Sequence, residues 1–274
     1  MKKIILVILF ALVLWGGVWS SNKWIETTEY TIVSEAVPAA FDGAKIVQIS
    51  DLHNATFGKN QSNLIEEIQS VKPDAIFLTG DFIDSNRFDL SASLVIIDEL
   101  VKMNKVYYVT GNHEIASNQV EEIAAALQER GVTVLANESV EWEKDGDTIQ
   151  IAGIDDPLSE PTKHEDEVMH DSLESARLTD DFTLLLVHRP EYLSTYAEFG
   201  VDVVFAGHAH GGQVRIPGIG GLYASGQGWF PKVTEGVFEE DQSQMVVSRG
   251  LGNSTFPIRI FNRPEVVVVT LKKE

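Results

Sequence analysis

Apolar and polar residues alternate in a regular order over the first half of the chain. Short, continuous apolar runs predict buried strands, and they lie at residues 46–50, 75–79 and 106–110. The segments that follow these runs carry apolar residues at helical spacing and predict helices at residues 60–71, 90–103 and 119–130. Strands that alternate with helices in this way predict an α/β sandwich.

Shorter apolar segments follow Gly131 and predict a second sheet. Asp145 and Gly146 predict a hairpin turn between two of its strands. Residues 157–171 show no clear period and predict a surface loop with a weak helix. The other expected elements are strands at residues 133–135, 140–143, 148–153, 182–187, 203–206, 244–248 and 265–271, and a helix at residues 191–199.

Glycine gathers in the segment 211–228, which holds seven of the 21 glycines of the chain. Apolar residues such as Val214, Leu222, Tyr223 and Trp229 lie between or just after these glycines. Two interpretations are open. The segment is either a meander that packs over the edge of a sheet, or a wall of a substrate site that also touches lipid.

The beginning of the chain has the pattern of a membrane-targeting segment. Lys2 and Lys3 precede an uncharged, largely apolar run at residues 4–19. Tryptophans close to the end of this run fit a membrane interface better than a processing site, so we expect an uncleaved signal anchor at residues 1–22. The lysines before the run place the N-terminus in the cytoplasm and the rest of the chain outside. The alternative is a cleaved signal, which leaves a secreted or cell-wall-associated protein.

The remainder of the chain is expected to form one domain. A chain of 274 residues is long enough for a large domain with a well-buried core. We expect a short tether at residues 23–29, a first strand at residues 30–34, and a single domain that extends over residues 30–274.

Charge and cysteine content exclude several classes of function. The net charge is −20, so most of the surface repels a phosphate backbone, and no nucleic-acid partner is expected. The chain has no cysteine, which excludes disulfides, thiolate metal sites and cysteine phosphatases. A metal site in this protein must therefore use nitrogen and oxygen ligands.

Side chains that bind metals directly follow five of the predicted strands. Ligands in α/β sheets gather at the carboxyl ends of the strands, where these side chains lie. Imidazole, carboxylate and carboxamide groups bind divalent transition metals. The residues are Asp51 and His53 after strand 46–50, Asp81 after 75–79, Asn112 and His113 after 106–110, His188 after 182–187, and His208 and His210 after 203–206.

These residues suffice for a pair of metal ions. Two divalent cations at about 3.5–4 Å need a bridging ligand, and the carboxylate of Asp81 is the candidate. We expect one site to comprise Asp51, His53, Asp81 and His210, and the other to comprise Asp81, Asn112, His188 and His208. A hydroxide shared by the metals would attack phosphorus in line.

His113 is the candidate catalytic side chain, because it follows the expected ligand Asn112 without being a ligand itself. We expect it to protonate the leaving oxygen or to stabilise charge on it. The alternative is a structural histidine that bonds a nearby carboxylate such as Glu114.

Five motifs in this order resemble the calcineurin-like metallophosphoesterase superfamily. They are Ser50-Asp51-Leu52-His53, Gly80-Asp81, Gly111-Asn112-His113-Glu114, His188-Arg189-Pro190-Glu191 and Gly207-His208-Ala209-His210-Gly211-Gly212-Gln213. The resemblance extends from about Tyr30 to the C-terminus. It implies a four-layer α/β/β/α sandwich, a centre of two manganese, iron or zinc ions with manganese favoured, and the ligands named above. Within the superfamily, the chain is similar to a bacterial membrane-associated branch of phosphodiesterases and UDP-2,3-diacylglucosamine hydrolases.

The sequence therefore predicts a metal-dependent enzyme that hydrolyses a phosphodiester or a pyrophosphate in a small or lipid-linked substrate. Arg189, Gln213 and Arg249 lie near the motifs and are candidate phosphate contacts. The alternative is a metal-binding scaffold at the membrane without turnover. The complete set of expected ligands favours the enzyme, since a degenerate scaffold would have lost some of them.

Overall fold

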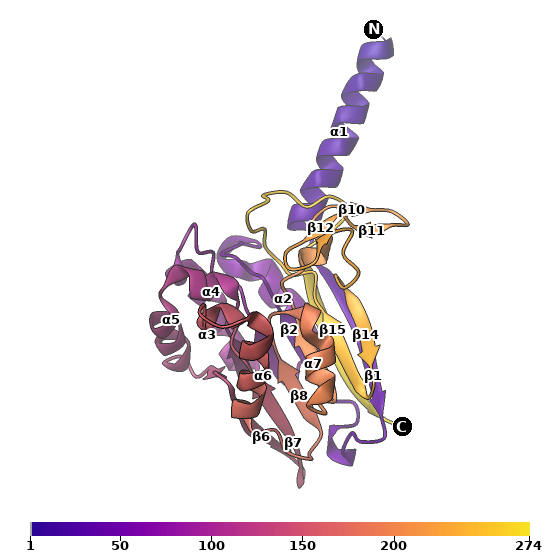
Figure 1. Ribbon diagram of the computed structural model, residues 1–274. Helices are drawn as coiled ribbons and strands as arrows, with labels where there is room; N and C mark the ends of the chain where they lie inside the picture. Colours follow the sequence, from indigo (N-terminus) through magenta and orange to yellow (C-terminus); the bar gives the residue numbers. More distant parts are fainter. Residues whose placement is uncertain (1) are drawn as a thin grey trace.

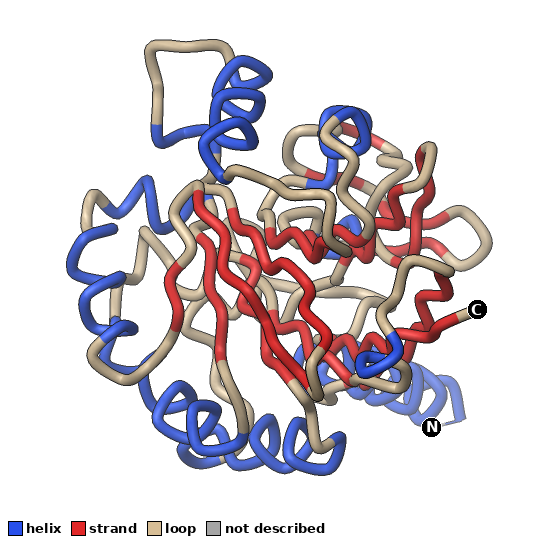
Figure 2. The backbone as a smooth tube through the Cα atoms, turned by 90° about the horizontal axis from the view of Figure 1, so that it is seen from below, coloured by secondary structure: helices blue, strands red, loops and turns tan. Residues whose placement is uncertain are grey.

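The computed structural model describes residues 2–274, with side chains for residues 3–5, 9 and 15–274 (Figure 1). Strands form the centre of the molecule and helices lie mainly at its periphery (Figure 2). The first six-stranded sheet has the order β1-β16-β2-β3-β4-β5, and only the pairing of β16 with β2 is antiparallel. Its strands are β1 (Glu26–Ser34), β16 (Glu265–Lys273), β2 (Lys45–Ile49), β3 (Ala75–Thr79), β4 (Val106–Val109) and β5 (Thr133–Val134).

The second six-stranded sheet has the order β14-β15-β9-β8-β7-β6. Its four inner strands are parallel to one another, and each edge strand pairs antiparallel with its neighbour. The strands are β14 (Gly236–Glu240), β15 (Ser243–Val247), β9 (Val203–Ala206), β8 (Thr183–Leu186), β7 (Asp147–Gly153) and β6 (Glu138–Lys144). The predicted α/β fold with parallel strands is confirmed.

Three apolar clusters define the layers. One lies between the sheets, where the rings of Phe77 from β3 and Phe205 from β9 meet edge to face at 4.9 Å. A second packs the outer face of the first sheet against helices, and a third does so for the second sheet. The helices are α2 (Ser62–Val71), α3 (Leu90–Met103) and α5 (Val120–Gln128) over the first sheet, and α6 (Glu165–Ala176) and α7 (Leu193–Glu198) over the second. The layers follow the predicted order of helix, sheet, sheet and helix.

This layering explains why the core strands are apolar at every position. In β3, Ile76 and Leu78 face the helices, whereas Ala75 and Phe77 face the other sheet. A strand that is covered on both faces needs no polar side, so its sequence is a continuous apolar run. Such a run ends where the sheet ends, and the first polar residue after it lies at the sheet's edge.

The N-terminal elements differ from the prediction. Two residues separate helix α1 (Lys2–Lys23) from β1, which begins at Glu26. The expected tether at residues 23–29 is therefore mostly strand. The physical reason is the partner strand β16, which pairs with β1 in parallel from Glu26 to Ser34 and orders residues that look irregular on their own. The division of the chain into an anchor and a domain stays a prediction.

Other segments also gain order from their neighbours. The weak helix expected within residues 157–171 is α6, which begins at Glu165, continues to Ala176 and buries Val168, Met169 and Leu173. The short helix α4 (Asn112–Ser117) and the edge strand β14 were not predicted. The glycine-rich segment forms two small antiparallel pairs, β10 (Arg215–Ile216) with β11 (Gly220–Gly221) and β12 (Tyr223–Ala224) with β13 (Gly228–Trp229).

Helix α1 projects from the end of the molecule that carries β10 and β12 (Figure 1). Within the described residues, no helix combines the length and the apolar character that crossing a bilayer requires. Several side chains of the apolar run 4–19 lie outside the described residues. The signal anchor stays a prediction.

Candidate metal centre

All the predicted metal ligands come together at one edge of the two sheets. They follow β2, β3, β4, β8 and β9, whose carboxyl ends meet there because these strands run parallel within each sheet. Many of them have a backbone that non-glycine residues seldom adopt. The left-handed φ angles are 52° at Asp51, 46° at His53, 51° at Asp81, 63° at His208 and 48° at His210. Unfavourable backbone of this kind gathers at functional sites, where the surrounding structure enforces it.

Two glycines make this close approach possible. A Cβ atom at Gly207 would overlap Ser50 Oγ and lie 2.6 Å from Asp51 Oδ2. A Cβ atom at Gly111 would likewise overlap the carboxylate of Asp81. Glycine is therefore required directly before His208 and Asn112, because the turns carrying these residues pass against the two carboxylates.

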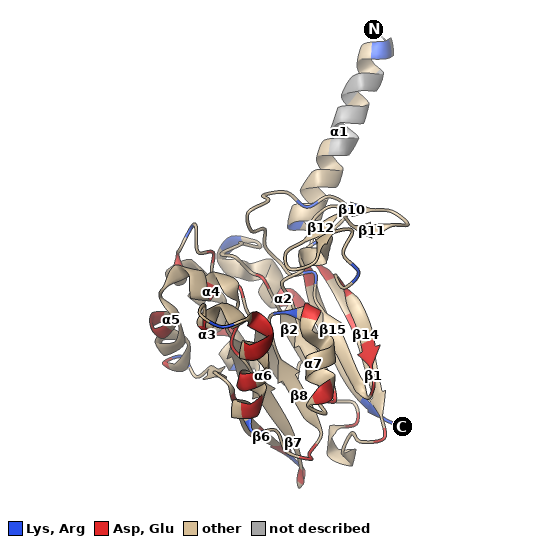
Figure 3. Ribbon diagram, viewed as in Figure 1, with Lys and Arg blue, Asp and Glu red and all other residues tan. Residues whose placement is uncertain are grey.

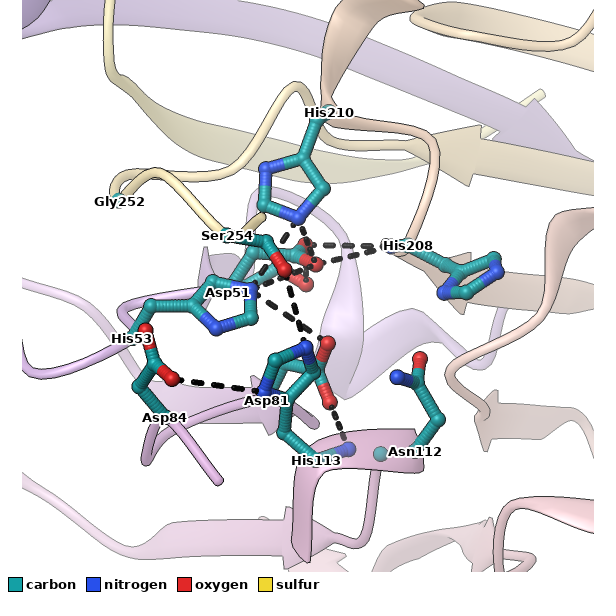
Figure 4. Close-up of polar contacts among 12 residues, drawn as sticks. Asp51, His53, Asp81, Asp84, Asn112, His113, His208, His210, Gly252 and Ser254 are labelled. Carbon is teal, nitrogen blue, oxygen red and sulfur yellow. Dashed lines mark hydrogen bonds and ion pairs between the residues drawn. The ribbon is translucent and has the colours of Figure 1, made fainter. Parts of the chain in front are cut away.

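The first group of ligands comprises Asp51, His53, Asp81 and His210 (Figure 4). The Nε2 atom of His53 lies 3.4 Å from Asp81 Oδ2, and that of His210 lies 3.2 Å from Asp51 Oδ1. The two Nε2 atoms are 3.1 Å from each other. All four ligand atoms lie within 4.8 Å of one another. This is the grouping that the sequence predicted for one metal.

The second group comprises Asp81, His188 and His208, with Asn112 beside them. His188 Nε2 lies 3.3 Å from Asp81 Oδ2, 3.1 Å from His208 Nδ1 and 3.2 Å from Asn112 Oδ1. Asp81 therefore belongs to both groups, as predicted for the bridging carboxylate.

The arrangement fits a pair of divalent cations. In each group, nitrogens of two imidazole rings face each other across 3.1 Å with carboxylate oxygens close by. A single proton can satisfy one such pair, whereas a cation accepts lone pairs from all the surrounding nitrogens and oxygens at once. The donors are imidazole and carboxylate, which suit divalent transition metals. The side chains thus form a candidate dinuclear metal site.

Burial and charge prepare several of these side chains to bind metal. Burial lowers the pKa of His53 to about 3, and it also lowers the pKa values of His208 and His210 well below the usual range. These rings are neutral at pH 7, so they can bind a cation without first releasing a proton. His188 differs from them. Burial lowers its pKa, but the carboxylate of Asp81 outweighs burial and raises it to about 10.

Glu114 supports the centre from behind. Its buried carboxylate accepts hydrogen bonds from the backbone N–H groups of Asp81 at 2.8 Å, Gly111 at 2.7 Å and Ile83 at 3.0 Å. Burial and then the charge of Asp81 raise the pKa of Glu114 to about 8. The hydrogen bonds to Glu114 join the turns after β3 and β4. Glu114 therefore bonds backbone groups and not the His113 ring. The carboxylate beside that ring is Asp84, whose Oδ1 atom lies 3.9 Å from His113 Nδ1 (Figure 4). The alternative of a structural histidine next to a carboxylate stays a prediction.

His113 lies at the rim of the centre and has defined partners. The backbone N–H of Ser85 points to its Nδ1 atom at 3.1 Å, so the proton of the neutral ring is on Nε2. Nε2–H donates to Ser254 Oγ at 2.9 Å (Figure 4). The backbone N–H of His113 donates to Asp81 Oδ1 at 2.7 Å. The ring therefore presents a proton beside the shared carboxylate. Ser85 and Ser254 have no sequence signal that identifies them.

A cavity of about 330 Å³ opens at the centre. It is lined by Asp81, Asn112, His113, His208, Ala209, His210, Gln213, Tyr223, Ala224, Ser225, Ser254, Thr255 and Phe256. Of the three predicted substrate contacts, Gln213 lines this cavity, and its Nε2 atom donates to the carbonyl of Phe256 at 2.9 Å. A role for Gln213 in substrate binding stays a prediction.

The two predicted arginine contacts are held by carboxylates. Arg189 pairs with Asp156 at 2.6 Å, and its Nη1 atom lies 3.2 Å from His208 Nε2. Arg249 pairs with Glu265 at 2.8 Å, with Glu26 at 3.0 Å and with Glu235 at 3.3 Å. The structure places Arg189 beside the candidate ligand His208 and Arg249 in an ion-pair cluster with residues of β1 and β16. Their contact with substrate also stays a prediction.

Sequence analysis missed Arg259, a fully buried arginine at the centre. Its Nη2 atom donates to the carbonyl of Gly252 at 2.6 Å and lies 3.2 Å from His210 Nδ1, while Nη1 has no hydrogen-bond partner. Burial lowers its pKa to about 10, so it keeps its charge at pH 7. Arg259 lies in an irregular segment 49 residues after His210. No local pattern points to it.

Comparisons with known proteins agree with this geometry. Residues 44–212 match the family described as calcineurin-like phosphoesterase. A Bacillus subtilis protein, the uncharacterized metallophosphoesterase YkuE, is 34% identical over 256 residues, which cover 90% of this chain and 86% of that protein. An uncharacterized metallophosphoesterase from Aquifex aeolicus is 28% identical and covers 91% of this chain and 92% of its own.

A solved structure shows the same fold at low identity. The TT1561 protein of Thermus thermophilus superposes with a TM-score of 0.51 at 14% identity, and covers 76% of this chain and 90% of its own. The match of the family model to most of the chain and the identity to the Bacillus protein both lead to one conclusion. The chain belongs to the calcineurin-like phosphoesterase family.

Proposed function

We propose that this protein is a phosphoesterase that uses two divalent cations, with manganese as the favoured metal. The observation that carries the proposal is Asp81, whose carboxylate belongs to both ligand groups and lies in the wall of a cavity. When bound, the two cations supply a nucleophile from water and neutralise charge on the phosphate oxygens. The side chains Asp51, His53, Asp81, Asn112, His188, His208 and His210 are the proposed ligands.

His113 is the proposed catalytic side chain, and its proposed role is to stabilise charge on the leaving oxygen. Its Nε2–H group faces the cavity and donates to Ser254 Oγ, which marks where another oxygen can accept the same proton. In the reaction, the leaving oxygen of the ester takes the place of that hydroxyl, and the Nε2–H group of His113 stabilises the charge that develops on this oxygen as the bond to phosphorus breaks. Ser85 keeps the proton on the correct nitrogen, because its backbone N–H occupies Nδ1.

We propose a phosphodiester or a pyrophosphate as the bond that is cleaved, in a lipid-linked substrate. The exposed apolar residues Tyr223 and Phe256 at the mouth of the cavity support this choice. It agrees with the predicted place of the chain in a bacterial membrane-associated branch near the UDP-2,3-diacylglucosamine hydrolases.

We also propose that α1 anchors the protein in the cell membrane, with the catalytic domain outside the cytoplasm. The exposed tryptophans Trp15, Trp19 and Trp24 lie at the end of α1 that adjoins the domain, as expected of an interfacial belt. The alternative is release of the domain after cleavage. For the anchored protein, the proposed partners are the membrane and the substrate, and no nucleic-acid partner is proposed.

The test is hydrolysis by the full-length protein, stripped of metal and resupplied with manganese, iron or zinc. The substrates are a phosphomonoester, a diester and a nucleotide pyrophosphate, and metal content is measured by mass spectrometry. We expect metal-dependent turnover, with Asp81→Ala losing both metal and activity. His113→Gln should keep its metal and lose about 10²–10⁴-fold in kcat. Bound metal without hydrolysis of any substrate, including a lipid pyrophosphate in detergent, would establish the scaffold alternative.

A further inference from the structure

The exposed aromatic side chains of this protein gather at one end. Among the described side chains, each exposed aromatic residue lies on or directly after α1, in or directly after the glycine-rich segment, or in the loop at residues 253–261. In Figure 1 these parts of the chain lie beside the base of α1. A contiguous apolar surface of this kind marks a binding site in soluble domains. The residues are Trp15, Trp19, Trp24, Tyr223, Trp229, Phe230, Phe256 and Phe261.

A groove of about 390 Å³ runs through part of this surface. Its walls are apolar, and no charged residue lines it. The rings of Tyr223 and Trp229 form one side, where they meet edge to face at 5.5 Å. The volume lies within the usual range of small-molecule sites, about 300–1,000 Å³. The lining residues are Gly212, Gln213, Val214, Leu222, Tyr223, Trp229, Thr255 and Phe256.

The groove is continuous with the cavity at the metal centre. Gln213, Tyr223, Thr255 and Phe256 line both spaces. A molecule in the groove can therefore extend into the cavity and place its polar end beside His113. Charge changes sharply along this path, because one end is free of charged groups and the other consists of carboxylates and imidazoles. A ligand that fits both ends has an apolar tail and a phosphorylated head.

We propose that the groove lined by Val214, Leu222, Tyr223, Trp229 and Phe256 binds the hydrocarbon chain of the substrate while its phosphate occupies the cavity. This inference rests on the proposed phosphoesterase function and specifies its substrate as a phosphate ester of a long-chain alcohol. Trp229 is 69% exposed and Phe256 is 52% exposed. A hydrocarbon chain in the groove removes their apolar surface from water, and this burial contributes favourable binding free energy.

The experiment compares methyl and hexyl 4-nitrophenyl phosphodiesters with the full-length, metal-loaded protein in one detergent. We expect kcat/KM to be about tenfold or more higher for the hexyl ester, mainly through KM. In Trp229→Ala and Phe256→Ala, the ratio between the two esters should fall to within about threefold of one. Val95→Ala is the matched control, because Val95 is also exposed but lies on α3, and its ratio should equal that of the wild type.

Partition of the esters into detergent is the same for every variant. A difference between variants in the ratio of the two kcat/KM values therefore reports binding in the groove. A wild-type ratio near one, or an undiminished ratio in both Trp229→Ala and Phe256→Ala, would overturn the proposal. A dependence on chain length that arises only on phospholipid vesicles and survives both substitutions would also overturn it, because the surface then binds the bilayer instead of a single chain.

Direct binding separates the groove from the proposed function. Calorimetry measures hexyl phosphate and methyl phosphate with the same metal-loaded proteins. We expect hexyl phosphate to bind at least about tenfold more tightly than methyl phosphate, and Trp229→Ala to abolish this difference. Such a result supports binding of the hydrocarbon chain in the groove even if neither ester is hydrolysed. Absence of hydrolysis would then contradict only the proposed phosphoesterase function. Equal binding of the two phosphates contradicts the groove, whatever the activity.

Discussion

Asp81 joins the two ligand groups through one oxygen atom. Its Oδ2 lies 3.4 Å from His53 and 3.3 Å from His188, whereas Oδ1 accepts the backbone N–H of His113 at 2.7 Å. In the structure, the second oxygen is taken by the turn after β4, which holds the carboxylate in a single orientation.

The pair of Asp81 and His188 predicts how the stability of the metal-free protein depends on pH. Burial lowers the pKa of His188, but the carboxylate of Asp81 outweighs burial and raises this pKa from the usual 6.5 to about 10, so the folded state holds a proton that the unfolded state loses. Stability from this group is complete below pH 6.5 and is lost as the pH rises to about 10. We expect the free energy of unfolding to fall on the order of 5 kcal/mol over this range.

Thermal unfolding of chelator-treated protein between these pH values measures the effect. His188→Gln should remove the part of the decline that depends on the imidazole. His170→Gln is the control, because His170 is exposed on α6 and its replacement should leave the curve unchanged. Identical curves for the wild type and His188→Gln would contradict the raised pKa.

At the scale of elements, hydrogen bonds join the end of α1 to the segment that carries Arg259. Asn22 Nδ2 donates to the carbonyl of Arg259 at 3.0 Å, and Asn22 Oδ1 accepts from Arg259 N at 3.0 Å and from Asn253 Nδ2 at 2.9 Å. The side chain of Arg259 then reaches His210. The end of α1 is thereby connected to a proposed metal ligand through one residue.

Asn22→Ala should therefore weaken both the fold and the metal centre. Loss of these hydrogen bonds costs about 1–3 kcal/mol of stability and frees the backbone of Arg259. We expect a lower melting temperature and faster loss of metal to a chelator, followed by mass spectrometry. Ser20→Ala is the control on the same helix, since the Ser20 hydroxyl donates to the carbonyl of Gly17 within α1. Unchanged metal release in Asn22→Ala would disprove the connection.

At the scale of the whole molecule, charge and apolar surface are unevenly distributed. Acidic residues are prominent on α6 and at the ends of strands far from α1 (Figure 3). The exposed aromatic residues lie at the α1 end, where the cavity and the groove also open. A net charge of −20 disfavours contact of the acidic surface with anionic lipids. The charge pattern thus favours an orientation with the α1 end towards a membrane.

Membrane fractionation of bacterial cells that express the full chain tests the proposed location. We expect the protein in the membrane pellet, resistant to carbonate, with its domain cleaved by protease added outside the spheroplasts. Leu9→Arg places a charge in the apolar run at a cost of about 3 kcal/mol and should move protein to the soluble fraction. Val95→Arg, on the exposed side of α3, should not. Soluble protein that is protected from the protease would contradict the anchor and its orientation.

The core strands and most of the site could be predicted from the sequence, because both are local patterns. The continuous apolar runs at β2, β3 and β4 report burial on two faces, and polar residues directly after them must lie at the edge of the sheet. Chemical type then identifies Asp51, Asp81 and the histidines as ligands. Each of these predictions needs only the order of residues within one strand and the turn that follows it.

Interactions between distant segments could not be predicted in this way. The bond between Asn22 and Arg259 joins residues 237 positions apart, and the pairing of β1 with β16 joins the two ends of the chain. The direction of a side chain depends on what packs around it. Packing turned Arg249 towards Glu265 and brought Arg259, which no motif marks, against His210. The sequence determined which groups gather at the sheet edge, because strand ends are local. Tertiary structure decided which oxygen of Asp81 is shared and which arginine lies at the centre, because side-chain direction follows from the packing of segments far apart in the chain.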